Sequence, residues 1–181
     1  MKIIKNQIEG LLEIIPDVYQ DDRGWFMEFT KRSNLSKAGI KHDFVQDNLS
    51  FSRKDVIRGL HYQRQPFGQA KLVTVISGSV LDVAVDLRKD SPTFLKHAVF
   101  HLDSGKRNML YIPEGFAHGF RAITDAVFFY KCSSEYNAEA DAGLRWNDPT
   151  IGIAWGVEFP SVSAKDAVLP LAEELLSKSF V

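Results

Sequence analysis

The stretch from Val56 to Lys71, VIRGLHYQRQPFGQAK, gathers side chains that could move protons and bind phosphate. His61 lies in an apolar segment, and an imidazole, with a reference pKa of about 6.5, can take a proton near neutral pH. Lys71 could stabilise a developing oxyanion, and Arg58 could bind phosphate oxygens with two hydrogen bonds. Each has an ordinary structural explanation when taken alone: a hydrogen-bonded core histidine, or a lysine in solvent. A chemical role therefore requires that they share a cavity.

Whether Arg58 and His61 can share a cavity depends on the geometry of the strand that carries them. Arg58 and His61 are three residues apart, so a regular strand would point their side chains to opposite faces. Gly59 lies between them, and glycine within a strand often marks a β-bulge that re-aims a neighbouring side chain. We therefore predict a bulge at Gly59. Alternation also puts Lys71 on one strand face with the apolar residues Val73 and Val75.

Other polar residues have two interpretations each. Asp82 and Asp86 share one face of the segment that follows, and that face is either exposed to solvent or turned into the interior of a barrel. His118 ends the turn sequence PEGFAH and enters a strand-like segment. The remaining histidines have no comparable setting and are interpreted as surface or edge residues; they are His42, His97 and His101.

A metal site is disfavoured by the same residues. The pattern Pro113-x-Gly115-x-x-His118 is similar to the second motif of cupin barrels, which often carry a metal ion. The His-x-His pair of the first cupin motif is replaced by His61-Tyr62-Gln63, so one imidazole is missing. Cys132 is the single cysteine, which rules out an internal disulfide and a thiolate cluster. ATP-binding and dinucleotide-binding glycine motifs are absent.

The composition and net charge limit the class of protein that carries these residues. A chain of 181 residues, 45% hydrophobic and 25% charged, suits one globular domain spanning residues 1–181. The net charge of −1 gives no field to attract nucleic acid. No apolar run reaches the roughly 18 residues of a membrane helix, and the N-terminus lacks a cleavage signal, so we expect a cytoplasmic protein without a membrane partner.

Apolar segments of strand length recur between Gly, Pro, Asp and Ser residues, which indicates an all-β sandwich or barrel with about ten strands. Helices are expected only at 33–39 and near the C-terminus, where Pro170 precedes an apolar stripe of Leu171, Leu175 and Leu176. The chain between 137 and 162 has no regular pattern. The expected strands are 11–16, 25–30, 44–52, 56–63, 71–77, 79–88, 94–102, 108–112, 116–123 and 126–133.

Eight segments, in order along nearly the whole chain, resemble the dTDP-4-dehydrorhamnose 3,5-epimerase family. They are Phe44–Asn48, Arg58–His61, Asp82–Arg88, Ser91–Phe94, Ile112–Phe120, Tyr130–Lys131, Trp146–Pro149 and Ser163–Asp166. The resemblance implies a cupin-type jelly-roll barrel that works as a homodimer without a metal or organic cofactor. It also implies inversion of C3 and C5 of dTDP-4-dehydro-6-deoxy-D-glucose, which gives dTDP-4-dehydro-L-rhamnose for polysaccharide synthesis.

The same resemblance assigns roles to individual residues. His61 would be the base, oriented by Asp166, while Tyr130 would be the acid on the other face of the sugar and Lys71 would steady the enolate oxygen. Tyr136 would stack on thymine. The other residues expected to contact the nucleotide or the sugar are Arg23, Glu28, Gln46, Asp47, Asn48, Arg58, His118, Asp141 and Lys165.

Several alternatives stay open. A relative could epimerise one carbon only, or could be a ketoisomerase that moves the carbonyl through an enediol; a separate acid such as Tyr130 is needed only for inversion. A non-catalytic sugar-binding barrel would keep the aromatic residues but would not need His61, Lys71, Tyr130 and Asp166 together. A metal-dependent cupin oxygenase is disfavoured by the missing imidazole.

Overall fold

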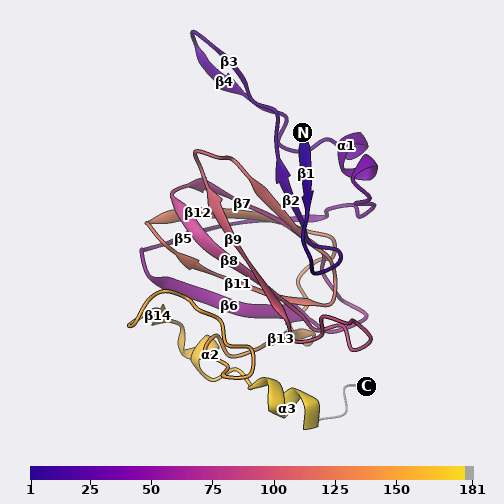
Figure 1. The fold of residues 1–181 in the computed structure, drawn as a ribbon, viewed down its shortest axis with the longest axis vertical. Coiled ribbons are helices and arrows are strands. Elements are labelled where there is room, and N and C mark those ends of the chain that lie inside the picture. The colour runs from indigo at the N-terminus through magenta and orange to yellow at the C-terminus, as the bar shows by residue number, and fades with distance from the viewer. Residues whose placement is uncertain (178–181) are drawn as a thin grey trace.

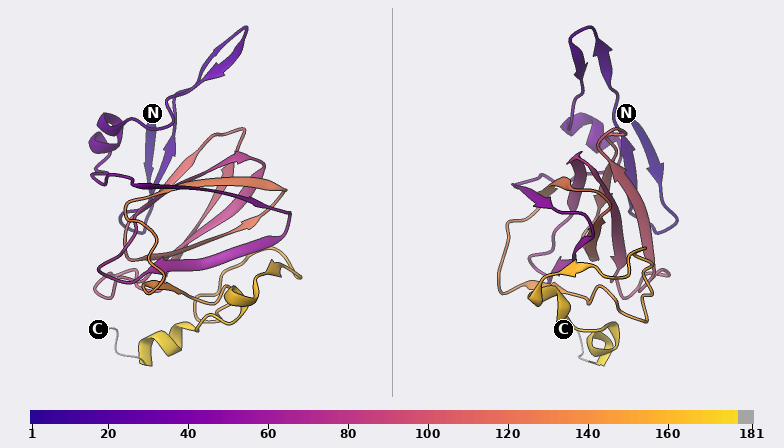
Figure 2. Two further views of the ribbon diagram at one scale, coloured as in Figure 1. Left: turned by 180° about the vertical axis from the view of Figure 1, so that it is seen from behind. Right: turned by 90° about the vertical axis from the view of Figure 1, so that its left-hand side faces the viewer.

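The computed structural model describes residues 1–177 and consists mainly of two β-sheets that face each other (Figures 1 and 2). The first sheet has the strand order β1-β2-β10-β7-β12-β5, and the second has the order β13-β6-β11-β8-β9. Neighbouring strands in these orders are antiparallel, while the short strand β14 runs parallel to β6. The first sheet comprises β1 (Lys2–Lys5), β2 (Leu12–Ile15), β5 (Gln46–Ser52), β7 (Lys71–Ser77), β10 (Met109–Ile112) and β12 (Ala126–Cys132).

The second sheet comprises β6 (Val56–Gln63), β8 (Ser79–Asp86), β9 (His97–Asp103), β11 (Phe116–Ala122) and β13 (Asp141–Gly143), with β14 (Ser161–Val162) beside β6. Three short helices complete the described part of the chain: α1 (Arg32–Lys37), α2 (Ala164–Ala167) and α3 (Ala172–Ser177). This arrangement is a cupin-like jelly roll, which confirms the predicted fold class.

Alternation along the strands decides which side chains enter the space between the sheets. In β8, Val83 and Val85 pack on the outside of the second sheet, while Ala84 belongs to the core between the sheets. In β7, Val73 and Val75 enter that same core, as predicted. Asp82 and Asp86 are completely buried, so the interior interpretation of this face is correct.

Two further apolar clusters cover the outer faces. One covers the second sheet with residues from the 144–157 segment and α3, including Leu144, Trp155 and Ala172. The other packs α1 and the chain around it against the β2, β7 and β10 part of the first sheet, with Leu35 and Ile40 at its centre. The outer face over β5 and the ends of β7 and β12 is left uncovered, and its exposed apolar side chains are Leu49, Phe51 and Ile76.

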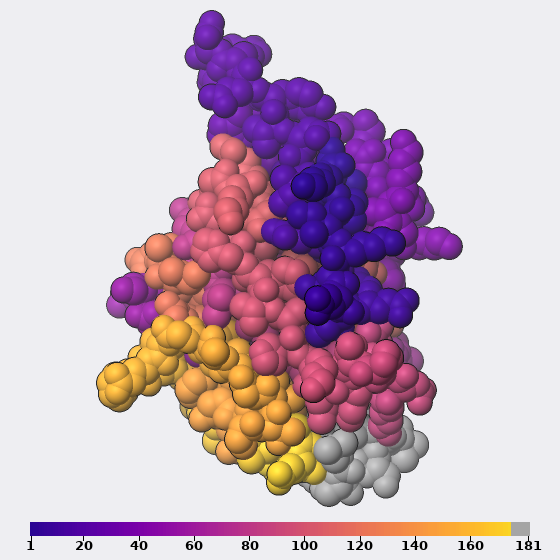
Figure 3. Space-filling model, viewed as in Figure 1, coloured from indigo at the N-terminus to yellow at the C-terminus, as the bar shows by residue number. Residues whose placement is uncertain are grey.

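A hairpin of β3 (Tyr19–Asp21) and β4 (Gly24–Phe26) projects from the body of the molecule (Figures 1 and 3). The strand predicted at 25–30 is therefore wrong in length, because β4 pairs only with β3 and ends at Phe26. The strand expected at 94–102 begins only at His97, since the preceding residues form turns. The prediction missed four short strands, namely β1, β3, β13 and β14, each of two to four residues.

The helix expected at 33–39 is α1, and the chain leaves it through Gly39, whose φ of +85° suits glycine. Near the C-terminus, α3 begins at Ala172 rather than at Pro170. The Pro170 carbonyl instead accepts a hydrogen bond from the Arg145 backbone. Of the predicted apolar stripe, the side chains of Leu175 and Leu176 lie outside the described part of the structure.

Candidate active site

Two cavities meet at four shared residues between the sheets: His61, Lys71, Tyr130 and Lys165 line both of them. The larger cavity, of about 570 Å³, is also lined by Arg58, His118 and Asp166, which come from β6, β11 and α2. The smaller cavity, of about 180 Å³, is also lined by Gln46, Asn48, Gln63, Gln69, Cys132, Tyr136 and Asp141. Most of the polar residues that the sequence singled out therefore surround one hollow.

His61 is bound to a carboxylate at the edge of the larger cavity. Its Nε2 atom lies 2.8 Å from Oδ1 of Asp166, whose side chain is almost fully buried while that of His61 is about one-third exposed. Burial raises the pKa of the Asp166 carboxyl, but contacts with His61, the Gly59 N–H and Ser163 outweigh it and lower this pKa. Asp166 is thus held as a carboxylate, which fixes the orientation of the ring and stabilises its protonated form.

The position of Asp166 follows from local structure at the C-terminal end of the chain. Strand β14 pairs with Val56 and Ile57 at the start of β6, so α2 begins beside Gly59 and His61. Ser163 caps α2 by accepting a hydrogen bond from the Asp166 N–H at 3.0 Å. Asp166 Oδ2 in turn accepts the Gly59 N–H at 3.1 Å. A residue more than a hundred positions away is thereby fixed against the imidazole.

The predicted bulge at Gly59 is confirmed. Gly59 has a φ of +126°, and the register between β6 and β11 shifts between the pairs His118–His61 and Phe120–Arg58. A Cβ atom on Gly59 would lie 2.6 Å from the Gly119 Cα atom, so only glycine fits this crossing. As a result, Arg58 and His61 line the same cavity, which a regular strand would prevent.

Lys71 and Tyr130 approach from the opposite sheet, on β7 and β12. Lys71 is 9% exposed. Burial lowers its pKa, although the nearby charges of Cys132, Asp82 and Asp141 act against this. Burial raises the pKa of the Tyr130 phenol. A buried lysine and a neutral phenol therefore lie across the hollow from the His61 imidazole.

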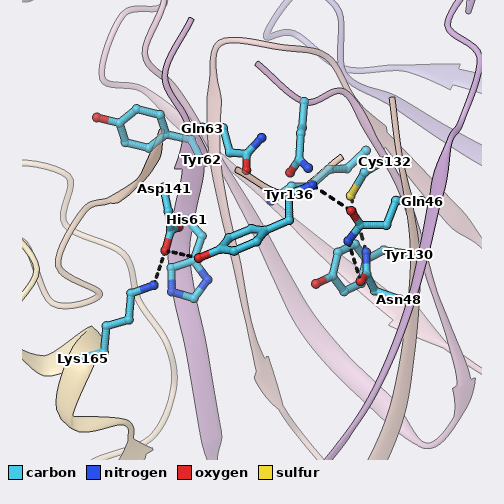
Figure 4. A pocket seen from close by; sticks show the side chains of 12 residues that line it. Gln46, Asn48, His61, Tyr62, Gln63, Tyr130, Cys132, Tyr136, Asp141 and Lys165 are labelled. Carbon is cyan, nitrogen blue, oxygen red and sulfur yellow. Dashed lines mark hydrogen bonds and ion pairs between the residues drawn. The ribbon is translucent and has the colours of Figure 1, made fainter. Parts of the chain in front are cut away.

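Tyr136 lies across the smaller cavity, with its ring between the two walls (Figure 4). The Tyr136 hydroxyl donates to Asp141 Oδ2 at 3.2 Å, and Asp141 also forms an ion pair with Lys165. The backbone N–H of Tyr136 donates to Gln46 Oε1 at 2.7 Å, and Gln46 donates to Asn48 at 2.9 Å. The exposed Tyr136 ring thus lies between the charged pair Asp141 and Lys165 on one side and the amides of Gln46 and Asn48 on the other.

Three of the predicted contact residues line neither cavity of this single chain. Arg23 is at the turn of the projecting hairpin, where its side chain is 90% exposed and pairs with Asp21. Glu28 is exposed and pairs with Lys31. Asp47 points from β5 to the outside, where both of its oxygens accept from Lys131 at 2.5 and 2.7 Å.

The sequence interpretation left the orientation of Asp82 open, assigned it no role, and did not identify Gln63 as a polar residue of the interior. Asp82 binds His118, and the buried amide of Gln63 accepts the Asn137 N–H at 2.7 Å and donates to the Phe67 carbonyl at 2.7 Å, joining two loops that border the smaller cavity. The alternation of side chains between the two faces of β8 was the sequence signal that could have placed Asp82 in the interior. The histidines interpreted as surface or edge residues, His42, His97 and His101, line neither cavity.

Within residues 1–177, no three His, Cys, Asp or Glu side chains gather closely enough to hold a metal ion. Over the same range, no helix has the length and apolar character required to cross a membrane.

A jelly roll that surrounds one hollow with a carboxylate-bound imidazole, a lysine amine and a phenol has the groups that an enzyme of acid–base chemistry requires. A sequence model of dTDP-4-dehydrorhamnose 3,5-epimerase matches residues 5–174. The chain belongs to the dTDP-4-dehydrorhamnose 3,5-epimerase family, and it is an enzyme.

Individual relatives agree with this assignment. The chain is 46% identical over 168 residues to a dTDP-4-dehydrorhamnose 3,5-epimerase of Shigella flexneri, covering 92% of this chain and 93% of the relative. It is similar to the crystal structure of the Legionella pneumophila epimerase RmlC in complex with dTDP-4-keto-L-rhamnose, with a TM-score of 0.91 and 43% identity over 94% of this chain and 92% of that one.

A more distant structural neighbour is the 3'-monoepimerase ChmJ of Streptomyces bikiniensis in complex with dTDP-quinovose. Its TM-score is 0.87, with 33% identity over 94% of this chain and 89% of that chain. ChmJ has also been crystallised as a double mutant in which one histidine becomes asparagine and one tyrosine becomes phenylalanine.

Proposed function

We propose that this enzyme inverts C3 and C5 of dTDP-4-dehydro-6-deoxy-D-glucose and releases dTDP-4-dehydro-L-rhamnose, using only its own side chains. One observation carries the proposal: the His61–Asp166 pair and Tyr130 line the same cavities from different sheets, with Lys71 beside them. The names of the relatives supply the substrate class, since those enzymes are called dTDP-4-dehydrorhamnose 3,5-epimerases.

The 4-keto group makes this chemistry accessible. It acidifies the hydrogens on C3 and C5, because the carbanion left after proton removal is delocalised as an enolate. His61 takes the proton, and the Asp166 carboxylate stabilises the imidazolium that results. The Lys71 ammonium stabilises the enolate oxygen from a buried position, where such an interaction is stronger than in bulk solvent.

Inversion requires that the new proton come from the other face of the ring. Tyr130 donates its phenol proton to the enolate carbon and afterwards regains a proton from solvent. Burial, which raises the pKa of Tyr130, keeps the phenol protonated and ready to donate. The residue types replaced in the ChmJ double mutant, a histidine and a tyrosine, match the base and the acid proposed here.

The nucleotide part of the substrate is assigned to the cationic and aromatic residues. Arg58 is held by Ser52 Oγ at 2.9 Å and by the Phe51 carbonyl at 3.0 Å, which leaves its guanidinium oriented along the larger cavity for diphosphate. Lys165 adds a second cation. Tyr136, more than half exposed, offers a ring for stacking of the thymine base.

A homodimer is the proposed working form. The uncovered face with Leu49, Phe51 and Ile76 is an apolar patch of the kind that marks a protein–protein interface. The hairpin that carries Arg23 projects from the body of the molecule (Figure 3), and neither Arg23 nor the nearby Glu28 lines the two cavities of its own chain, so we assign their nucleotide contacts to a second copy of the chain. The earlier prediction of cytoplasmic location stays a prediction.

The test is proton NMR of dTDP-4-dehydro-6-deoxy-D-glucose incubated with the enzyme in deuterated water. Replacement of hydrogen by deuterium at both C3 and C5, with formation of the L-rhamno product, is the expected result. Exchange at C3 alone would favour the second candidate function, a single-carbon epimerase. The similarity to the 3'-monoepimerase ChmJ is the observation that supports this candidate. Absence of exchange at either carbon would overturn the proposal.

A further inference from the structure

Asp82 is a buried carboxylate that the proposed reaction does not yet use. It lies in the middle of β8, is completely buried, and faces the space between the sheets. Its two oxygens lie 3.1 and 2.9 Å from the same atom, Nε2 of His118. A carboxylate fully removed from water is costly unless it is paired, so its position requires an explanation.

The contact between Asp82 and His118 has the same form as the contact between Asp166 and His61. His118 and His61 are directly paired residues of the neighbouring strands β11 and β6. Both rings bind a buried carboxylate through Nε2, His61 to Asp166 and His118 to Asp82. In each case Nδ1 is the ring nitrogen not used by the carboxylate, and both rings line the larger cavity. The floor of the cavity thus holds two carboxylate-bound imidazoles side by side.

Lys71 stands opposite, on β7 of the other sheet, and no hydrogen bond or ion pair satisfies its ammonium within residues 1–177. The negative charge of Asp82 raises the pKa of Lys71 and so opposes the effect of burial. Asp141 and Cys132 act in the same direction. The other titratable or charged groups that line the cavities shared with Lys71 are Arg58, His61, His118, Tyr62, Tyr130, Tyr136, Lys165 and Asp166.

We propose that Asp82 is a positioning residue: its carboxylate holds the His118 imidazole in the larger cavity, beside His61 and across from Lys71. The inference rests on the proposed function, because it concerns the groups that would meet the enolate oxygen. Asp82 does not touch the reacting atoms and acts only through His118 and Lys71.

Asp82→Asn is the direct test, since asparagine keeps the shape and removes the charge. We expect kcat for deuterium exchange to fall by about 10²-fold, the order seen when an oxyanion-stabilising donor is lost, while binding of dTDP is unchanged. Without the negative charge, Lys71 loses its proton at lower pH. The basic limb of the kcat profile should therefore move to lower pH.

Asp86→Asn is the matched control. Asp86 lies on the same face of the same strand and is equally buried, but its partners are Arg88, Ser91 and Thr93, away from the cavities. Its replacement should lower the melting temperature without moving the basic limb or kcat. A folded Asp82→Asn enzyme with wild-type kcat and an unmoved basic limb would overturn the inference, as would an equal shift in the Asp86→Asn control.

A measurement on the wild-type enzyme keeps the inference testable if Asp82→Asn does not fold. In protein labelled with ¹⁵N on the histidine rings, His118 should carry hydrogen on Nε2 throughout the pH range of activity. An Nε2 atom without hydrogen would contradict the contact with Asp82. Failure of the proposed function has a different signature, because the wild-type enzyme itself would then show no exchange.

Discussion

At the scale of the residue, the two proposed proton carriers belong to different strands and different sheets. His61 is on β6 and Tyr130 on β12, so each can be altered without disturbing the backbone of the other. The reaction divides in the same way, into removal of a proton on one face and its return on the other.

Replacement of Tyr130 by phenylalanine should separate these two halves. His61 can still remove the C3 and C5 protons and return deuterium to the same face, so exchange continues while inversion is lost by about 10²-fold or more. NMR in deuterated water measures both events in one sample. His61→Ala, the companion variant, should lose exchange and inversion together. Its melting temperature should fall but the enzyme should stay folded, because the buried Asp166 carboxylate loses the imidazole and keeps the Gly59 N–H. Full inversion by Tyr130→Phe would remove Tyr130 as the acid.

The pH dependence of exchange should report on Lys71. Burial lowers the Lys71 pKa, and only the ammonium form stabilises the enolate, so activity should fall as pH rises through that lowered pKa. Burial raises the pKa of the Tyr130 phenol, so its titration moves to higher pH, away from that of Lys71. The basic limb of exchange should therefore lie below the ordinary pKa of a lysine and persist in Tyr130→Phe. A limb that disappears in that variant would assign it to the phenol.

At the scale of the element, the bulge in β6 is the feature on which the site depends. Gly59→Ala would place a methyl group against the Gly119 backbone in a conformation that favours glycine, at a cost of roughly 3 kcal/mol in the free energy of unfolding. Gly24→Ala is the control, since Gly24 has a similar φ of +131° but open space around it. It should cost about 1 kcal/mol.

Urea unfolding followed by circular dichroism gives both values. Equal destabilisation in the two variants would mean that backbone conformation alone matters, and that the close crossing of β6 and β11 at Gly59 and Gly119 does not.

The elements that the sequence predicted best are those with many residues in strict alternation. Strands β7, β8 and β12 follow the period of two, and the glycine at position 59 indicated the bulge that interrupts this period in β6. The strands that were missed have few residues and take their structure from a partner: β14 exists only because it pairs with the start of β6. Local patterns carry no information about such pairings.

The same limit applies to the site. Periodicity put Lys71 on an interior face, but it left Asp82 equally compatible with solvent, because two aspartates in a strand usually face water. The partner of His61 came from the family resemblance alone. No local pattern could join residues 61 and 166, since their contact depends on how the C-terminal segment lies against β6.

At the scale of the whole molecule, the proposed dimer can be tested through its apolar face. Leu49 is two-thirds exposed on β5, and Leu49→Asp should prevent association, because burying an unpaired carboxylate in an apolar interface is costly. Light scattering after size-exclusion chromatography measures the mass. Val168→Asp is a matched control, since Val168 is exposed on a different part of the surface, beside α2.

The activity of each variant should depend on whether it is a dimer or a monomer. A Leu49→Asp monomer keeps its own His61, Lys71 and Tyr130 but has no second hairpin to supply Arg23, so it should bind dTDP more weakly. A fully active monomer would show that Arg23 has no part in the site, and an unmodified chain of monomeric mass would remove the dimer proposal itself.

The contact between His61 and Asp166 also has a consequence for how the enzyme is made. Asp166 follows His61 by 105 positions in the sequence. Most strands of both sheets, β1 to β13, come from residues before 144 and can form during synthesis before the carboxylate exists. The imidazole therefore gains its orienting partner only after residue 166 has been made. A chain truncated shortly before residue 161 should lack exchange activity, even where circular dichroism shows that its β-structure is retained.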